Sequence, residues 1–588
     1  MLKAEIRTGA YYDSVVLMQL QRALAALPGV LEAGVVMGTP ANKDVLAQSN
    51  LLAPEIQAAA MDDLVIVISA TEEQAALDAL AQVDELLVRR RQADVDIAYR
   101  PKSLDVAIKM QPDAQWVLVS VPGRYAADVC KEALRLGKNV FLYSDNVPVA
   151  EEAALKQMAA QAGLLVMGPD CGTAIVNGIG LGFANRVRKG PIGLIGASGT
   201  GLQHVAARIH QLGAGITHAL GAGGRDLSEA INGQTTQQAL DLLDRDPNTQ
   251  LIVIISKPPT PHVAEALIRR ARQAGKPVII NFIGYQPAPE MRNDTSGKLH
   301  FVRTLDATAQ KAVELAATFR SEANHSNTES VTTESVDTLL QNVHSCSFAP
   351  TQKYLRALFS GGTLAYETLL ILQEYLPAVY SNVPLDKRFR LPKATQSQEH
   401  TVVDLGEDEF TVGRLHPMMD NALRIKRLHQ EAADPATALI LLDVVLGYGA
   451  HPDPASELAP AIAEAQEAAA QAGRTLPVVA IVVGTDEDPQ DLAHQVAQLE
   501  AAGAIVAFNL EDAVRRIGET LQTLSPRSAG LGVDLAVLTE PLTAINVGLE
   551  IFTDSLRVQG AAVVQVDWRP PAGGNERLAG LLARMKSR

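Results

Sequence analysis

The chain has 588 residues, 47% of them hydrophobic and 20% charged, and a formal net charge of −15. This length suits roughly three to five domains. The acidic balance argues against general nucleic-acid binding, although it is compatible with a local basic site for a small anion. Because the sequence contains neither a long apolar run nor a signal-peptide core, we expect no membrane span and, by default, a cytoplasmic location. Three scattered cysteines are too few for a disulfide framework or a cysteine-based metal site.

Two α/β segments are expected before residue 190. Residues 1–98 should form a small α/β domain with strands at 2–6, 31–36 and 64–69 and helices at 15–27 and 72–89. Residues 99–190 should follow as a parallel α/β domain with strands at 116–121, 140–143 and 164–167. A polar turn follows each of these three strands, at the sheet edge where parallel sheets bind ligands. The last turn makes Asp170 and Cys171 candidate substrate contacts; Cys171 could in principle be a nucleophile, but the sequence assigns it no base.

The segment 190–207, GPIGLIGASGTGLQHVAA, joins an apolar strand to an amphipathic helix through a glycine-rich turn. The turn contains Ser198, Gly199, Thr200 and Gly201. A strand, a tight turn and a helix start point unpaired backbone N–H groups and the positive end of the helix dipole at one place, which suits phosphate. The plain alternative is a turn that needs glycine only for its tight geometry.

A second turn of the same kind contains Ser360, Gly361, Gly362 and Thr363. Because similar strands and polar turns follow both turns in the same order, we interpret 191–320 and 353–525 as two copies of one unit. They should be related by an approximate two-fold axis, with both helix starts close enough to share one anion. The polar segment 321–352 is expected to be a flexible linker, and 526–588 a C-terminal α/β extension.

Two arginines and a histidine complete the candidate site. Arg225 and Arg414 occupy matching places in the two copies, and an arginine can hold a carboxylate or phosphate through two parallel hydrogen bonds. Either arginine could instead pair with a neighbouring acid, Asp226 or Asp408. His416 is the candidate proton shuttle, with a cap or turn role as the alternative.

The motifs resemble those of the succinyl-CoA synthetase superfamily, and over nearly the whole chain those of the FdrA family of acyl-CoA-synthetase-like proteins. The matching motifs are MGTPANK at 37–43, SVPGRYAA at 120–127, MGPDCGT at 167–173, IGASGTG at 195–201, GGRDLS at 223–228, SKPP at 256–259, GRLHPM at 413–418, LLDVVLGYGA at 441–450 and PPAGGN at 570–575. The resemblance implies several Rossmann- or flavodoxin-like parallel-sheet domains. Residues 99–190 would be CoA-binding-like, 191–320 a first ligase-like domain, and 353–525 a fused domain like the carboxyl domain of the synthetase β subunit.

Two synthetase elements have no counterpart in the sequence: the GHAG loop that carries a phosphorylated histidine, and the glycine-rich loop that binds CoA. Members of the FdrA family are associated with anaerobic allantoin breakdown, as one component of a multi-subunit oxamate carbamoyltransferase. The resemblance therefore implies a carbamoyltransferase that interconverts oxamate and carbamoyl phosphate with oxalurate and phosphate. No cofactor or metal is expected, and other subunits and a homo-oligomer are the expected partners.

In this interpretation the catalytic residues are Ser198, Gly199, Thr200, Ser360, Gly361, Gly362, Thr363 and His416. The substrate-binding residues are Gly201, Arg225, Arg414, Asp170 and Cys171. Two alternatives stay open. The chain could be an acyl-CoA ligase, against which the missing CoA loop counts, or a non-catalytic scaffold subunit, against which the two intact turns count.

Overall fold

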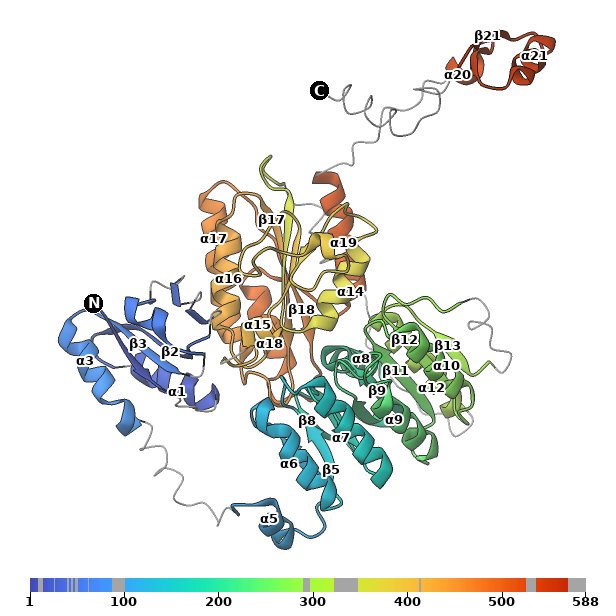
Figure 1. Ribbon diagram of the computed structural model, residues 1–588. Helices are drawn as coiled ribbons and strands as arrows, with labels where there is room; N and C mark the ends of the chain where they lie inside the picture. Colours follow the sequence, from blue (N-terminus) through green and yellow to red (C-terminus); the bar gives the residue numbers. More distant parts are fainter. Residues whose placement is uncertain are drawn as a thin grey trace. The chain divides into compact units, whose positions relative to one another are not determined.

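The computed structural model describes residues 1–8, 14–25, 27–39, 42–43, 46–47, 51–61, 63–86, 101–288, 297–321, 347–411, 414–524 and 536–568 (Figure 1). The chain divides into two compact units, residues 1–525 and 526–588. In the part of the chain that is described, no helix is long and apolar enough to cross a membrane.

The N-terminal segment forms an antiparallel sheet of order β1-β3-β2. Its elements are β1 (Leu2–Arg7), α1 (Ser14–Ala25), β2 (Val30–Met37), η1 (Pro54–Ala58), β3 (Leu64–Ala70) and α3 (Glu73–Ala81). Alternate side chains of β3 enter two apolar clusters. Leu64, Ile66 and Ile68 pack with residues of α1 and α3, whereas Val65 and Val67 pack with Ile56 of η1. The expected strands are present. The predicted helix 72–89 is interrupted after α3, residues 83–86 are again helical, and residues 87–89 lie outside the described residues.

A parallel sheet of order β4-β5-β6 follows, as expected. Its elements are α5 (Leu104–Met110), β4 (Trp116–Val119), α6 (Gly123–Arg135), β5 (Asn139–Leu142), α7 (Val149–Ala162) and β6 (Val166–Met167). Apolar side chains of α6 and α7 pack against this sheet, with Cys130 and Leu155 fully buried among them. The carboxyl ends of β4 and β5 lead into two of the polar turns noted in the sequence.

The third sheet has the order β13-β12-β11-β9-β10-β7-β8. Its elements are β7 (Thr173–Val176), β8 (Ile179–Gly182), β9 (Lys189–Ala197), α8 (Gly199–Gln211), β10 (Ile216–Gly221), α9 (Gln234–Arg245), β11 (Leu251–Ser256), α10 (Pro261–Arg272), β12 (Val278–Phe282), β13 (Leu299–Phe301) and α12 (Leu305–Ser321). Strands β9 to β13 run parallel, whereas the hairpin β7–β8 joins β10 in antiparallel pairing.

That hairpin places residues 173–182 in this sheet, whereas the sequence had assigned them to the preceding domain, which was expected to extend to residue 190. Asn177 and Gly178 form its turn, and both have a positive φ, 52° and 80°. Two consecutive residues with positive φ match the two-residue hairpin turn for which Asn-Gly is the favoured sequence. The sheet therefore begins earlier in the chain than the predicted boundary at 191.

The fourth sheet is parallel throughout and has the order β15-β16-β14-β17-β18-β19. Its elements are β14 (Tyr354–Phe359), α14 (Gly362–Leu372), β15 (Tyr380–Ser381), η3 (Lys387–Phe389), β16 (Thr401–Asp404), α15 (Asp408–Thr411), α16 (Ala422–Ala433), β17 (Thr437–Val445), α17 (Pro454–Gln471), β18 (Val478–Val483), α18 (Leu492–Ala501), β19 (Ile505–Ala507) and α19 (Leu510–Leu524). The order β19-β18-β17-β14-β16 corresponds strand for strand to β13-β12-β11-β9-β10. This correspondence supports the proposal that the two segments are copies of one unit.

The third and fourth sheets share one apolar core. Leu202 and Val205 of α8 lie in the same buried cluster as Leu364 and Leu369 of α14. A polar contact also joins the segments of these two sheets: the Asn185 side-chain amide donates a hydrogen bond to the Leu446 carbonyl at 3.0 Å. Helices α8 and α14 therefore pack against each other, which brings their first turns together.

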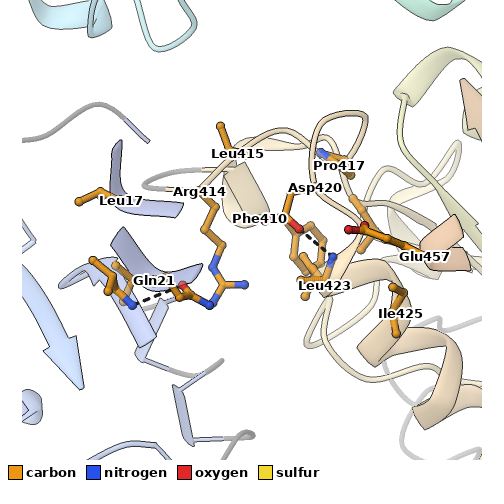
Figure 2. A pocket seen from close by; sticks show the side chains of 14 residues that line it. Leu17, Gln21, Phe410, Arg414, Leu415, Pro417, Asp420, Leu423, Ile425 and Glu457 are labelled. Carbon is orange, nitrogen blue, oxygen red and sulfur yellow. Dashed lines mark hydrogen bonds between the residues drawn. The ribbon is translucent and has the colours of Figure 1, made fainter. Parts of the chain in front are cut away.

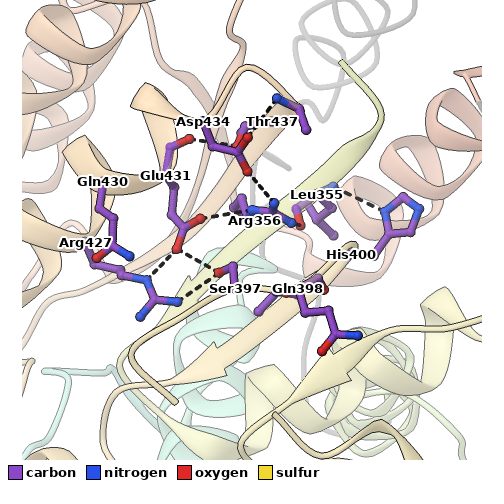
Figure 3. Close-up of polar contacts among 12 residues, drawn as sticks. Leu355, Arg356, Ser397, Gln398, His400, Arg427, Gln430, Glu431, Asp434 and Thr437 are labelled. Carbon is purple, nitrogen blue, oxygen red and sulfur yellow. Dashed lines mark hydrogen bonds and ion pairs between the residues drawn. The ribbon is translucent and has the colours of Figure 1, made fainter. Parts of the chain in front are cut away.

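A buried ionic network anchors β14, the strand that leads into the second glycine-rich turn (Figure 3). Arg356, only 3% exposed, pairs with Glu431 at 2.9 Å and with Asp434 at 2.7 Å. Glu431 also accepts from Ser397 and pairs with Arg427. Because both arginines and Glu431 are buried, the loss of one partner would leave an uncompensated charge in the core.

The second unit consists of α20 (Ala536–Thr539), β20 (Thr543–Val547), α21 (Glu550–Val558) and β21 (Ala562–Val566), with β20 and β21 parallel. Asn546, Thr553 and Gln565 hydrogen-bond to one another between strands and helix. Ile545 and Val564 are 72% and 64% exposed. Much of the apolar surface of this unit is therefore open.

Candidate functional site

The two glycine-rich turns meet. The hydroxyl oxygens of Ser198 and Thr363 are 2.6 Å apart. A methyl group built on Gly361 would lie 2.0 Å from the Thr200 Cγ2 atom, so only glycine allows this approach at position 361. The helix starts are therefore adjacent, as expected for turns that share one anion.

Both turns open into a cavity of about 1010 Å³. Its walls are formed largely by the ends of parallel strands and the turns that follow them. These are residues 118–124, 143–146, 170, 172–173, 197–200, 360–363, 404 and 406–408, together with Lys257, Arg414, His416 and others. Strand ends from the second, third and fourth sheets thus converge on one space, as ligand sites of parallel sheets do. The cavity combines the starts of α8 and α14, whose first N–H groups have no partner within the helix.

Lys257, which follows β11, supplies a positive charge that the sequence analysis did not single out. An added Cβ on Gly362 would lie 2.7 Å from the Lys257 Nζ atom and 2.5 Å from an Asp404 carboxylate oxygen, so all three meet at the start of α14. Among the described residues no carboxylate lies within the 4.0 Å that defines an ion pair with Lys257. The SKPP motif directly after a buried strand was the available signal.

Several donors of the two turns are already engaged within the protein. Ser198 caps α8 by accepting from the Gly201 backbone N–H at 3.0 Å. Ser360 donates its backbone N–H and its hydroxyl to the two carboxylate oxygens of Asp443, both at 2.8 Å. The Ser360 hydroxyl therefore fixes the turn and is not directed at a ligand. The Thr363 hydroxyl is engaged as well, because it pairs with the Ser198 hydroxyl. The candidate anion donors that remain are the other first-turn N–H groups and the Thr200 hydroxyl.

Arg225 is not among the residues that line the cavity. Its guanidinium pairs with the buried Glu152 at 3.0 Å and donates to the Val147 carbonyl at 2.8 Å. Arg225 therefore pairs with an acid, as the alternative interpretation of the sequence had it, but the acid is Glu152 and not Asp226. Asp226 pairs instead with the fully buried Lys156, at 2.7 Å. The placement of Arg225 suits a structural role better than substrate binding.

Arg414 lies on the cavity wall, and its Nε atom donates to the Asn42 side-chain oxygen at 2.8 Å. On its other side Arg414 lines a smaller pocket of about 480 Å³, whose walls include Leu17, Phe410 and Leu423 (Figure 2). Arg414 thus lies between the two hollows and, unlike Arg225, can reach a ligand in the larger one.

His416 is buried beside the cavity, and its ring lies 5.0 Å from that of Phe183. Burial, and next the positive charge of Arg424, lower the pKa of His416 to about 4. Its Nδ1 atom accepts from the Met418 backbone N–H at 3.3 Å, which assigns the ring proton to Nε2. A neutral imidazole of this kind is a hydrogen-bond donor at neutral pH and a weak base, so the geometry does not favour a proton shuttle.

Cys171 is buried, and its thiol contacts the Thr173 carbonyl at 3.5 Å. Burial raises the pKa of Cys171 to about 12, so the sulfur is a protonated thiol and a poor nucleophile. The neighbouring Asp170 differs, because its side chain lines the cavity and its backbone has a φ of 52°. The GPDCGT turn thus presents its aspartate, and not its cysteine, to the cavity.

Carboxyl groups gather around Lys257. Removal from water, followed by repulsion from Asp145 and Asp408, raises the pKa of Asp170 to about 7, against the opposing effect of Lys257. Burial also raises the pKa of Asp404 to about 7, and again Lys257 opposes the shift. Two cavity carboxyls therefore change charge near neutral pH.

Among the described residues no group of three or more His, Cys, Asp or Glu side chains is arranged to hold a metal ion.

Family models match three parts of the chain. Residues 358–519 match a CoA-ligase model, residues 187–284 a CoA-binding-domain model, and residues 1–100 a model described as the AllF heavy metal-associated domain. The last segment contains neither cysteine nor histidine, the side chains that bind soft heavy metals.

Curated relatives agree with these matches. The chain is 42% identical over 506 residues to the uncharacterized protein YahF of Escherichia coli, which covers 86% of this chain and 96% of YahF. It is 30% identical to the α subunit of malate–CoA ligase from Methylorubrum extorquens, over 32% of this chain and 64% of that protein. It is also 30% identical to the SauD subunit of an ADP-forming sulfoacetate–CoA ligase from Bilophila wadsworthia, over 34% and 68%.

The expected carbamoyltransferase assignment is wrong, because the matching models describe a CoA ligase and a CoA-binding domain, and the functionally named relatives are CoA-ligase subunits. These findings favour the acyl-CoA ligase interpretation and give no support to oxamate or carbamoyl phosphate as substrates. The α/β fold with several parallel sheets agrees with the expected fold class. By its near full-length likeness to YahF and its two ligase-type domains, the chain belongs to the FdrA family of acyl-CoA-synthetase-like proteins.

Proposed function

We propose that the chain performs the acyl-transfer half of an acyl-CoA ligase reaction, in which an acyl group moves between phosphate and the CoA thiol. The observation that carries the proposal is the meeting of two helix starts beside Lys257 in one cavity. Helix N-termini, backbone N–H groups and a lysine are the donors that bind phosphate. Two such starts at one point suit an acyl phosphate, whose phosphoryl group must be held while its carbonyl carbon reacts.

The exchange needs no redox partner. A phosphate oxygen attacks the thioester carbonyl, the carbon–sulfur bond breaks, and the departing sulfur takes the proton released by phosphate, so that acyl phosphate and the free thiol result. Fixed donors at the phosphate bring the two reactants into one orientation, which accounts for a large part of the rate of such reactions. Lys257 would also favour the dianionic nucleophile over the monoanion.

The thiol would approach from the side of the cavity formed by the turn after β4. Residues 120–124 of this turn line the cavity, and α6 begins there. A side chain at Gly123 would lie 2.1 Å from the Asp145 carbonyl oxygen, so glycine is needed for the two turns to touch. This arrangement offers a helix start for the CoA moiety without the glycine-rich loop whose absence had counted against CoA.

Small acids with a second anionic group are the proposed substrates. The named CoA-ligase relatives act on malate and sulfoacetate, which both have this character. Arg414 lies on the cavity wall and would hold the second anionic group through its guanidinium. Since these relatives are named as subunits, we also propose a partner subunit, which would supply the nucleotide-dependent step that the missing GHAG loop leaves open.

The test is phosphate-dependent release of CoA from succinyl-CoA, malyl-CoA and sulfoacetyl-CoA by the purified full-length chain, followed with a thiol reagent. We expect release that saturates with phosphate, and a loss of roughly a hundredfold in the Lys257→Met variant. Thioester cleavage at the same rate with and without phosphate, or none with any of the three thioesters, would contradict the proposal.

A further inference from the structure

Two buried polar groups on the cavity wall have no hydrogen-bond partner. Gln203, on α8, and Thr173, at the start of β7, are each 2% exposed. The Gln203 amide nitrogen and the Thr173 hydroxyl oxygen find no partner among the described residues. Both residues line the cavity into which the glycine-rich turns open. An unpaired buried polar group is costly to the folded protein, so its presence at a cavity points to a ligand that pairs with it.

The position of these groups defines what they can contact. A Cβ built on Gly199 would lie 3.6 Å from the Thr173 hydroxyl, so this hydroxyl lies beside the first turn of α8. Gln203 lies about one helical turn further along the same helix. The Thr173 hydroxyl therefore lies beside the start of α8, whereas the Lys257 ammonium lies beside the start of α14.

Their chemistry also differs from that of the phosphate site. Both donors are uncharged, and the cavity already provides Lys257 and two helix starts for the charged phosphoryl group. Uncharged N–H and O–H donors suit a carbonyl oxygen, which gains negative charge only while its carbon is attacked. We infer that Gln203 and Thr173 form a subsite for the carbonyl oxygen of the acyl group, next to the phosphate position.

This inference rests on the proposed function, since it assigns the acyl carbonyl of the same reaction. In the exchange, the carbonyl oxygen becomes an oxyanion when the phosphate oxygen bonds to carbon, and it returns to a carbonyl when sulfur leaves. Gln203 and Thr173 would donate hydrogen bonds to that oxyanion throughout, without transferring a proton. They are catalytic residues in the sense that they touch the reacting group.

Binding of two matched phosphonates separates the subsite from turnover. Acetonylphosphonate has a carbonyl where acetyl phosphate has one, with a methylene in place of the bridging oxygen, whereas propylphosphonate has the same length and no carbonyl. We expect the full-length protein to bind acetonylphosphonate about tenfold more tightly. The preference should disappear in Gln203→Leu and Thr173→Val, while the affinity for propylphosphonate stays within about twofold. Thr173→Ser, which keeps the hydroxyl, should retain the preference.

Stability gives a second readout. Each of Gln203→Leu and Thr173→Val removes an unpaired buried polar atom from the free protein and should leave the urea midpoint unchanged or raise it. A lower midpoint would show that these groups stabilise the fold, and would overturn the inference. So would a carbonyl preference that persists in both variants, or that is absent from the unmodified protein. Failure of phosphate-dependent thioester cleavage would reject the proposed function, whereas the phosphonate preference decides the subsite by itself.

Discussion

Replacing Gly362 by alanine places a methyl group at the point where the start of α14, Lys257 and Asp404 converge. The new Cβ atom would lie 2.7 Å from the Lys257 Nζ atom and 2.5 Å from the Asp404 carboxylate, both closer than van der Waals contact. Each of these atoms is the end of a side chain, so the side chains can shift while the fold persists. The methyl group then occupies the approach to the first-turn N–H groups.

Loss of a well-placed donor to a reacting anion costs about 3 kcal/mol, roughly a hundredfold in rate. We therefore expect Gly362→Ala to lower phosphate-dependent thioester cleavage by about that factor, with most of the loss in kcat/KM for phosphate. The measurement is steady-state kinetics at varied phosphate, with urea unfolding as the control for folding. Gly362 is a sharper target than Gly361, where a side chain would also force the two turns apart.

Gly275→Ala provides a matched control, because its Cβ would meet only the Asp244 carboxylate at 3.5 Å, an ordinary contact outside the cavity. This variant should keep full activity. Equal activity in folded Gly362→Ala and Gly275→Ala would refute the reasoning, since it would mean that no anion approaches the start of α14.

Three further predictions follow from charges in the first unit. Because Asp170 and Asp404 have pKa values near 7, both gain protons as the pH falls from 8 to 6. Binding of sulfate, which stays a dianion in this range, should therefore tighten about tenfold. A sulfate affinity that calorimetry finds independent of pH would contradict this. Glu431→Gln leaves two buried arginines without their shared carboxylate and should cost about 3 to 5 kcal/mol in urea unfolding, whereas Asp386→Asn, in an exposed pair, should change little. Burial lowers the pKa of His400 to about 4, below that of the unfolded chain, so the free energy of unfolding decreases as the pH falls from 6.5 towards 4. His400→Asn should reduce this decrease between pH 7 and pH 5 by about 2 kcal/mol. An unchanged pH dependence of urea unfolding would show that His400 is not responsible.

Much of the local structure could be predicted because its signals are local. Short apolar runs bounded by glycine or polar turns marked strands such as β9, β11 and β17, since a strand buried on both faces is composed mostly of apolar residues. The hairpin β7–β8 also had a local signal, the Asn177-Gly178 pair, but it was not used. Its sheet was consequently assigned too few strands.

The site was less predictable because its properties depend on contacts between distant residues. The proximity of Ser198 and Thr363 followed from the repeated motif order. By contrast, the engagement of Ser360 by Asp443 and of Arg225 by Glu152 depends on packing across separate elements. Spacing along the chain does not determine which of several nearby acids an arginine or serine meets.

The reaction class was mispredicted because it followed the association of the FdrA family with oxamate carbamoyltransferase, and because one missing motif was given too much weight. The missing glycine-rich loop was read as evidence against CoA, yet the start of α6 at Gly123 lines the cavity without that loop. A helix start can bind an anion with little sequence signature, because backbone N–H groups provide the donors. The absence of one motif was therefore weak evidence against the chemistry.

The central claim is that one anion binds between the starts of α8 and α14. The most direct measurement is a crystal structure of the full-length protein with selenate, in which anomalous scattering locates the anion. The account predicts a peak within hydrogen-bond distance of Lys257 and of first-turn backbone N–H groups at Gly199 and Gly362. A peak only elsewhere on the protein, or none at a selenate concentration that competes with phosphate, would contradict it.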